Sequence, residues 1–198
     1  MPLVDAVVLD LGNVLVFHDD AVLIDRLARL GDKTADQIRA NLREVWEPCN
    51  RGRLAGEALR QAVGAAAGVE FDEATFADIW SCHFRFHHEV LPDVEALFGR
   101  VKVLLLSNTN ATHLAWIRPR LPLLERFDGL VLSYELGIAK PDPAIFAEAV
   151  RLAGTTPGRT AFFDDIEAYA RAAQSAGLRG HVFTDASNFR RQLAALGL

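Results

Sequence analysis

Polar residues that could bind and transfer a phosphoryl group follow several short apolar segments of the chain. An aspartate comes directly after residues 7–9, and a serine and an asparagine follow residues 104–106. A pair of aspartates follows residues 161–163, and a lysine stands in GIAKPDPAIF, beyond an apolar run near Val131. Each group is ordinary on its own, but their recurrence after successive apolar runs is not. The candidate residues are Asp10, Ser107, Asn108, Lys140, Asp164 and Asp165.

The candidate aspartates would carry like charges at close range if their strands lie side by side. Like charges raise one another's pKa and oppose folding, so we expect a hard divalent cation to neutralise them. Mg²⁺ favours carboxylate and carbonyl oxygen and keeps waters that a phosphate can replace. Lys140 adds positive charge, and the Ser107 hydroxyl with nearby backbone N–H groups suits phosphate oxygens. This set predicts in-line phosphoryl transfer, in which a carboxylate takes the group as an aspartyl-phosphate.

Strand and helix patterns alternate from residue 91 onward. Apolar runs predict strands, and the amphipathic stretches between them predict helices. Together with residues 7–9, the alternation predicts an α/β fold with a three-layer, Rossmann-like parallel sheet, which places its chemistry at the carboxyl ends of its strands. The expected strands are 7–9, 101–106, 129–133, 160–163 and 180–183, and the expected helices are 92–100, 109–118, 142–153, 166–176 and 187–196.

Residues 17–89 have helical spacing and contain no convincing strand. Because this segment follows the first strand, we expect it to lie over the crevice at the carboxyl ends of the strands and to act as a lid. The predicted division is a catalytic core of residues 1–16 and 90–198 and a small helical cap of residues 17–89. The helices expected in the cap are 21–30, 36–46, 57–67 and 72–88.

Composition and charge exclude other classes of protein. The 198 residues carry a net charge of −5 and no Lys/Arg-rich run, so we expect no nucleic-acid partner. No segment approaches the ~18 apolar residues of a membrane span, and the N-terminus does not have the pattern of a signal peptide. Cys49 and Cys82 form no metal-binding motif and are expected to be reduced helix residues. We therefore expect a cytoplasmic monomer or homodimer that binds a small phosphorylated metabolite and no membrane.

The motifs resemble those of the haloacid dehalogenase-like (HAD) hydrolase superfamily. They are DLGNVL from Asp10, LLLSNTN, GIAKPDPAIF and FFDDIEAYARAAQSAG, and the helical insert matches the family's cap in position and size. DLGNV and LSNTN look most like the bacterial sugar-phosphatase branch that includes the α-glucose-1-phosphate phosphatases. The resemblance implies a phosphoric monoester hydrolase with Mg²⁺ as its cofactor.

The resemblance also implies a role for each candidate residue. Asp10 corresponds to the nucleophile, Lys140 to the lysine that holds nucleophile and phosphate together, and Asp164 to the acid that orients this lysine or the metal waters. Ser107 corresponds to the phosphate-binding hydroxyl, with Asn108 beside it at the substrate. The implied metal ligands are Asp10, Asp165 and the main-chain carbonyl of Gly12.

Two positions depart from the commonest family pattern. The usual second Asp, two residues after the nucleophile, acts as general acid and then base, but Gly12 stands there in this chain. Such help is typically worth ~10²–10⁴ in rate. A sugar C1 phosphate leaves more readily than a simple alkyl phosphate, so the missing acid favours an anomeric phosphate. Tyr169 stands where DDxxxN forms carry Asn, and it either changes how Asp164 and Lys140 are held or simply packs.

Other functions remain open at this stage. Dehalogenation of 2-haloacids needs no metal and no acid at the Gly12 position, but Asp164 and Asp165 would repel a carboxylate substrate. A catalytically weakened HAD scaffold could bind a phosphoryl ligand for regulation, although the other candidate residues are retained. A phosphomutase is disfavoured because it needs the missing acid.

Substrate choice is expected to depend on the cap. A lone cap histidine could replace the missing acid, whereas a metal site at His83 and His87, four residues apart on an expected helix, is disfavoured. Arg51 and Arg53 are expected to be solvated, and His113 to be structural. The cap candidates are Trp46, Arg51, Arg53, His83, Phe84, Arg85, Phe86, His87 and His88.

Overall fold

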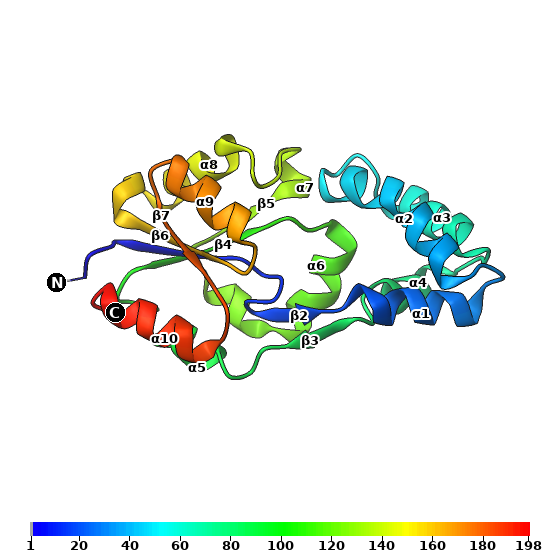
Figure 1. Cartoon of the computed structure of the whole chain (residues 1–198), viewed down its shortest axis with the longest axis horizontal. Helices are drawn as coiled ribbons and strands as arrows, with labels where there is room; N and C mark the ends of the chain where they lie inside the picture. The colour runs from blue at the N-terminus through cyan, green and yellow to red at the C-terminus, as the bar shows by residue number, and fades with distance from the viewer. Residues whose placement is uncertain (1) are drawn as a thin grey trace.

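A parallel sheet forms the centre of the structure, a computed structural model that describes residues 2–198 (Figure 1). Its strands are β1 (Ala6–Leu9), β4 (Lys102–Ser107), β5 (Gly129–Leu132), β6 (Thr160–Asp164) and β7 (Arg179–Val182). They lie in the order β5-β4-β1-β6-β7, and every pair is parallel. The predicted α/β fold is confirmed, and β1 is its central strand.

Helices cover both faces of this sheet. Val7 and Leu9 of β1 belong to one apolar cluster and Ala6 and Val8 to another, because side chains alternate along a strand. Both faces of β1 are therefore buried, as its unbroken apolar sequence predicts. The first cluster includes residues of α5 (Leu91–Glu95), α6 (Ala111–Ile117) and α10 (Ala186–Ala195), and the second includes residues of α8 (Pro143–Ala153) and α9 (Glu167–Ser175).

A group of helices between β1 and β4 packs around an apolar cluster of its own. These helices are α1 (Asp20–Leu30), α2 (Ala35–Asn50), α3 (Gly56–Ala67) and α4 (Glu73–Trp80). Their cluster includes Leu27, Leu42, Val63 and Trp80. Figure 1 shows them in blue to green at the end of the molecule away from the sheet. We propose that this helical unit is the cap, with its limits at residues 17 and 89.

A short antiparallel strand pair at the base of the helical unit corrects the expectation of an all-helical insert. The pair consists of β2 (Val16–His18) and β3 (Phe84–Phe86). The helix expected over 72–88 ends at Trp80, so His83 and His87 do not share a helix face. Aromatic residues recur there at helical steps, but Phe84 and Phe86 also alternate as in a strand. Pairing with the distant strand β2 makes this segment a strand instead of a helix, and no local sequence pattern predicts that pairing.

Other element boundaries differ from the predictions by a few residues. α6 begins at Ala111 instead of residue 109, and Asn110 caps it because its side chain accepts a hydrogen bond from the His113 N–H. The helix expected over 92–100 ends at Glu95, and Cys82 lies in a turn instead of a helix. Within residues 2–198, none of the helices is long and apolar enough to cross a membrane. The unpredicted helical segments are α7 (Ser133–Leu136), Arg118–Arg120, Pro122–Arg126 and Pro157–Arg159.

Candidate active site

The carboxyl ends of β1, β4 and β6 bring the sequence-predicted residues to one place. Leu9 of β1 lies opposite Leu105 of β4 and Phe163 of β6, so the next residue of each strand also lies at this edge. The Asp10 N–H donates to the Phe163 carbonyl at 2.9 Å and continues the ladder. Asp164 is fully buried beside this edge. The predicted residues that line one pocket here are Asp10, Gly12, Ser107, Asn108, Lys140 and Asp165.

Lys140 connects two of the buried carboxylates. Its Nζ lies 2.8 Å from Asp10 Oδ1 and 2.6 Å from Asp164 Oδ2, and its side chain is only 1% exposed. The backbone of Lys140 is held by Asn108, whose Nδ2 donates to the Lys140 carbonyl at 3.0 Å and whose Oδ1 accepts the Lys140 N–H at 2.8 Å. The Asn108 side chain therefore positions Lys140, in addition to lining the pocket.

The aspartates carry more negative charge than Lys140 can balance. Carboxylate oxygens of Asp10, Asp164 and Asp165 lie within 4.8 Å of one another. Burial raises the pKa of Asp10 to about 6, although Lys140 opposes this shift, and burial also raises the pKa of Asp164. Burial works against the charged form of Lys140, but Asp10 and Asp164 outweigh it and raise its pKa. The negative charge that Lys140 does not balance requires a further cation.

The donors at this edge of the sheet suit Mg²⁺. Asp10 and Asp165 offer carboxylate oxygens to the pocket, and Gly12 lies in the loop between β1 and β2 with its main-chain carbonyl. Mg²⁺ prefers such hard oxygen ligands and binds through one or two carboxylates together with substrate phosphate. One divalent cation would balance the negative charge of Asp10, Asp164 and Asp165 that the single Lys140 ammonium leaves over, so the residues present fit this ion.

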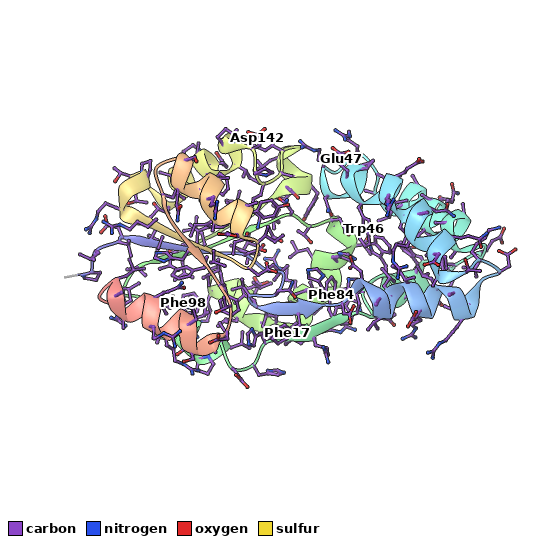
Figure 2. All side chains as sticks on the ribbon, in the orientation of Figure 1. Phe17, Trp46, Glu47, Phe84, Phe98 and Asp142 are labelled. Atoms are coloured by element: carbon purple, nitrogen blue, oxygen red, sulfur yellow. The ribbon has the colours of Figure 1, made fainter. Side chains whose placement is uncertain are left out.

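The pocket has a volume of about 280 Å³ and lies between the sheet edge and the cap helices. Its apolar lining includes Trp46, Phe84 and Ile117, and its polar lining includes His83 and His113. Figure 2 labels Trp46 and Phe84 where the cap helices meet the rest of the molecule. The pocket therefore combines a charged floor at the strand ends with a mixed aromatic and polar wall.

The chain matches the haloacid dehalogenase-like hydrolase family over residues 4–177, which covers both the sheet-edge residues and the helical insert. It belongs to this family. The resemblance expected from the motifs is thus confirmed, and the chain is a HAD-family hydrolase.

Relatives of this HAD-family hydrolase include named phosphatases. A D-ribitol-5-phosphate phosphatase from Bacteroides thetaiotaomicron is 27% identical over 202 residues, covering 96% of this chain and 97% of the relative. A sesquiterpene phosphatase from Aspergillus oryzae is 28% identical over 145 residues, covering 72% of this chain and 74% of the relative.

Solved structures with the same fold support the metal assignment. A HAD-family enzyme from Bacteroides thetaiotaomicron, in complex with magnesium and inorganic phosphate, has a TM-score of 0.83 and 25% identity over 92% of this chain and 95% of its own. L-2-haloacid dehalogenase from Xanthobacter autotrophicus has a TM-score of 0.64 and 21% identity, over 97% of this chain and 83% of its own, and shares the fold alone. A structural neighbour is thus in complex with magnesium, and the acidic cluster of this HAD chain suits the same ion.

His18 lies beside the position where many HAD members carry the general acid. A Cβ atom added to Gly12 would lie 3.3 Å from the imidazole Cδ2 and Nε2 of His18 and 3.8 Å from Asp10 Oδ2. This spacing is tighter than ordinary van der Waals contact, so the His18 ring occupies space that a side chain at position 12 would need. Glycine at this position is therefore compatible with His18 and with its place in β2.

Gly12→Ala tests this fit between Gly12 and His18. We expect the substitution to lower the free energy of unfolding by about 1 kcal/mol, because the added methyl group overpacks the site. The loss of unfolding free energy should be smaller in a His18→Ala background, where no imidazole ring occupies the space beside position 12. Denaturant unfolding of the wild type, the two single variants and the double variant measures this difference as a double-mutant cycle. An equal loss in both backgrounds would mean that the His18 ring does not limit position 12.

Asn13 supports the metal-ligand side of the site. Its backbone has a φ of 52°, in the left-handed region that asparagine tolerates better than most residues. From there its Nδ2 donates to Asp165 Oδ2 at 2.9 Å, and its Oδ1 accepts the His18 N–H at 3.3 Å. Asn13 therefore orients Asp165 and links the first motif to the last.

Tyr169 contacts the Lys140 ammonium. Its ring centroid lies 5.2 Å from Lys140 Nζ, and the ring of Phe162 lies 5.5 Å from the same atom. These are cation–π distances, and such contacts favour the charged amine in a desolvated site. Both alternatives for this departure from the DDxxxN form therefore apply, because Tyr169 contacts Lys140 and also packs against the apolar cluster of α8 and α9.

The cap candidates divide into two groups. Trp46, His83 and Phe84 line the pocket. The Nδ1 atom of His87 instead lies 3.0 Å from the Val14 carbonyl, outside the pocket lining. The other candidates that do not line the pocket are Arg51, Arg53, Arg85, Phe86 and His88.

The two arginines expected to be solvated form polar contacts. Arg51 pairs with Glu47 at 2.7 Å and donates to the Gly137 carbonyl at 3.3 Å, which joins the helical insert to α7. Arg53 also pairs with Glu47 and is exposed. Arg51 is therefore a contact between the insert and the rest of the chain.

Several pocket residues escaped the sequence reasoning. His113 was expected to be structural, and its Nε2–H does donate to the Trp80 carbonyl at 3.1 Å, but it also lines the pocket. Burial lowers its pKa to about 3, so it is neutral. The polar run His18-Asp19-Asp20, which follows the first motif after two apolar residues, was the signal that could have identified His18 and Asp20 as site candidates. The missed residues that line the pocket are Leu11, Val16, His18, Asp20, Asn50, Thr109, Ile117 and Ile166.

Proposed function

We propose that this HAD-family hydrolase is a Mg²⁺-dependent phosphatase for a small, hydroxylated phosphomonoester. The observation that carries the proposal is the Lys140 bridge, in which one buried ammonium lies 2.8 Å from Asp10 and 2.6 Å from Asp164. This group, with Asp165 beside it, provides a nucleophile, a counter-charge and metal ligands at the bottom of one pocket. The named phosphatases among the relatives support the same reaction class.

The proposed reaction takes place in two steps at Asp10. A carboxylate oxygen of Asp10 attacks phosphorus in line with the ester bond, this P–O bond breaks, and the leaving alkoxide takes up a proton from a solvent water. Water then attacks the aspartyl-phosphate, which releases inorganic phosphate and restores Asp10. Lys140 and the Ser107 hydroxyl hold phosphoryl oxygens throughout. Mg²⁺ bound by Asp10, Asp165 and the Gly12 carbonyl would supply further positive charge to those oxygens.

We propose a sugar or polyol phosphate as the substrate. One relative is named for D-ribitol 5-phosphate, and the polar pocket lining suits hydroxyl groups. Gly12 favours a leaving group that departs without strong acid help, such as the anomeric oxygen of a hexose 1-phosphate. These two considerations point to different esters, so both belong in the same substrate panel.

Phosphate release from a panel of phosphomonoesters tests the function. With Mg²⁺ we expect turnover of D-ribitol 5-phosphate or glucose 1-phosphate. EDTA should lower the rate by at least about 100-fold, because the phosphoryl charge then lacks several kcal/mol of stabilisation, and excess Mg²⁺ should restore it. Undiminished turnover in EDTA would contradict Mg²⁺ dependence. Preference for simple alkyl monoesters over hexose 1-phosphates would contradict the anomeric hypothesis alone.

The alternatives named from the sequence have distinct outcomes in the same experiment. Chloride or fluoride release from 2-haloacids without Mg²⁺ would favour a dehalogenase, which the fold similarity to a haloacid dehalogenase allows but Asp164 and Asp165 oppose. Binding of phosphate esters without turnover of any of them would favour a weakened scaffold that binds a phosphoryl ligand.

The proposed partner is a small phosphorylated metabolite, as the phosphatase relatives suggest. A cytoplasmic location is also proposed, and it is supported by Cys49 and Cys82, which are free thiols. Whether the chain is a monomer or a homodimer, and whether it avoids nucleic acid and membranes, stay predictions.

A further inference from the structure

Asp20 presents a carboxylate to the pocket from the cap side, and it faces the His18 ring. It is the first residue of α1, and the preceding Asp19 already caps the helix by accepting the Ala21 N–H at 2.9 Å. The Asp20 side chain is 54% exposed and lines the pocket. Its Oδ1 atom lies 3.7 Å from His18 Nδ1 and 4.0 Å from His83 Nε2, which is beyond hydrogen-bond distance. Its oxygens are therefore available to a donor that enters the pocket.

His83 adds a buried polar group at the same wall. Its side chain is 2% exposed, its Nε2 faces Asp20, and its Nδ1 has no hydrogen-bond partner within the described part of the chain. Buried polar atoms in folded proteins nearly always have a partner, whether protein, water or ligand. Burial lowers the pKa of His83 to about 4, so its neutral ring offers one donor and one acceptor.

His18 extends this polar wall to the reaction centre. Its Nδ1 faces Asp20, and its Nε2 lies 3.4 Å from Asn13 Nδ2, beside Gly12 and Asp10. A carbon chain that runs along this wall from a phosphate at Asp10 passes His18 before it reaches Asp20.

Aromatic rings lie beside these polar groups in the pocket lining. Trp46 stacks on Trp80 at 4.6 Å between ring centroids, and Phe84 lies 4.2 Å from the His83 ring. A pocket lined by aromatic rings as well as by a carboxylate and imidazoles suits a carbon chain that carries both C–H groups and hydroxyl groups. Sugars and polyols have this arrangement, whereas a plain alkyl chain would leave the Asp20 wall without donors.

We propose that Asp20, flanked by His18 and His83, is the specificity-determining group that accepts hydrogen bonds from the hydroxyls of a polyol or sugar phosphate. The inference rests on the proposed phosphatase function and adds the residue that chooses the leaving group. The same negative charge repels a second anion on the substrate, so esters that also carry a carboxylate should be rejected. Asp20 thus selects for neutral hydroxylated chains in two ways.

Matched substrates and variants test the inference. D-ribitol 5-phosphate and n-pentyl phosphate have the same chain length but differ in hydroxyl groups. For Asp20→Asn we expect KM for the ribitol ester to rise about tenfold, since hydrogen bonds to charged groups are the stronger class. The values for the pentyl ester should change less than about twofold, and hydrolysis of a phosphorylated aldonic acid should improve. Asp25→Asn, an exposed position on the same helix, is the control and should leave all three substrates unaffected.

An equal change in KM for the ribitol and pentyl esters would overturn the specificity role of Asp20, provided the variant keeps the thermal midpoint of the wild type. Failure of the phosphatase function gives a different result, which is that the wild type releases no phosphate from any ester. Isothermal titration calorimetry then tests the inference. If Asp20→Asn binds ribitol 5-phosphate more weakly than the wild type but binds inorganic phosphate equally well, the inference is supported. Equal affinities in the two proteins would refute it.

Discussion

Asp10→Asn is expected to lower Mg²⁺-dependent phosphate release by at least about 10⁴-fold, because the amide cannot form the aspartyl-phosphate on which turnover depends. The substitution keeps the size of the side chain, and its backbone N–H still donates to Phe163. Steady-state phosphate release by wild type and variant, with the substrate found in the panel, measures the loss. Turnover within about tenfold of wild type would show that another residue is the nucleophile.

Thermal unfolding provides the control for this variant. In EDTA, Asp10→Asn should unfold at the wild-type temperature or above it, because burial opposes the charge of Asp10 and raises its pKa to about 6. A neutral amide avoids that cost. Mg²⁺ should stabilise the wild type more than the variant, since it binds only the folded site and loses one ligand in the variant. If Asp10→Asn unfolds at a much lower temperature than the wild type, its loss of activity could come from unfolding. The variant Asp10→Glu would then replace Asp10→Asn in the kinetic comparison.

Lys140→Met is expected to have the second-largest effect, and on both stability and activity. Removing this ammonium leaves Asp10 and Asp164 buried without their partner, which typically costs about 3–5 kcal/mol when one member of a buried pair is lost. Activity should fall by about 10³-fold, because Lys140 holds the nucleophile and neutralises the phosphoryl oxygens. Denaturant unfolding and phosphate release measure the two losses. Mg²⁺ should recover part of the stability and little of the activity.

Lys102→Met is the matched control for Lys140. Lys102 also pairs with an aspartate, Asp128, at 2.7 Å, but its side chain is 58% exposed. Exposed ion pairs contribute about 0–1 kcal/mol, so this variant should keep both stability and activity. A loss for Lys140→Met no larger than that for Lys102→Met would contradict a central role for the buried bridge.

Local patterns in the sequence were sufficient to predict the sheet and the catalytic edge. The runs that became β1, β4 and β6 are apolar because these strands are buried on both faces, and this composition is visible without any partner. Parallel strands then leave their carboxyl ends on one side, so Asp10, Ser107 and Asp164 had to come close together. The metal and phosphate roles followed from the charges at that edge, and they still await measurement.

Contacts between distant segments could not be predicted in the same way. The helical spacing of aromatic residues after Trp80 suggested a longer helix, and only pairing with β2 makes Phe84–Phe86 a strand. Asn108 was expected at the substrate, but its side chain also fixes the backbone of Lys140 32 positions away. Such contacts depend on how elements pack against each other, so they cannot be predicted from the propensity or periodicity of one segment.

The sequence by itself determined the α/β core, the helical insert and the residues that could bind phosphate and metal, because apolar runs, helix caps and charged strand ends are local features. Only the tertiary structure decided what surrounds Asp10. It brought Asn13 to Asp165 across 152 positions, set the His18 ring against Gly12, and turned Asp20 and His83 toward the pocket. These arrangements arise from the β2–β3 pair and the packing of the cap helices, which join segments that no local pattern connects.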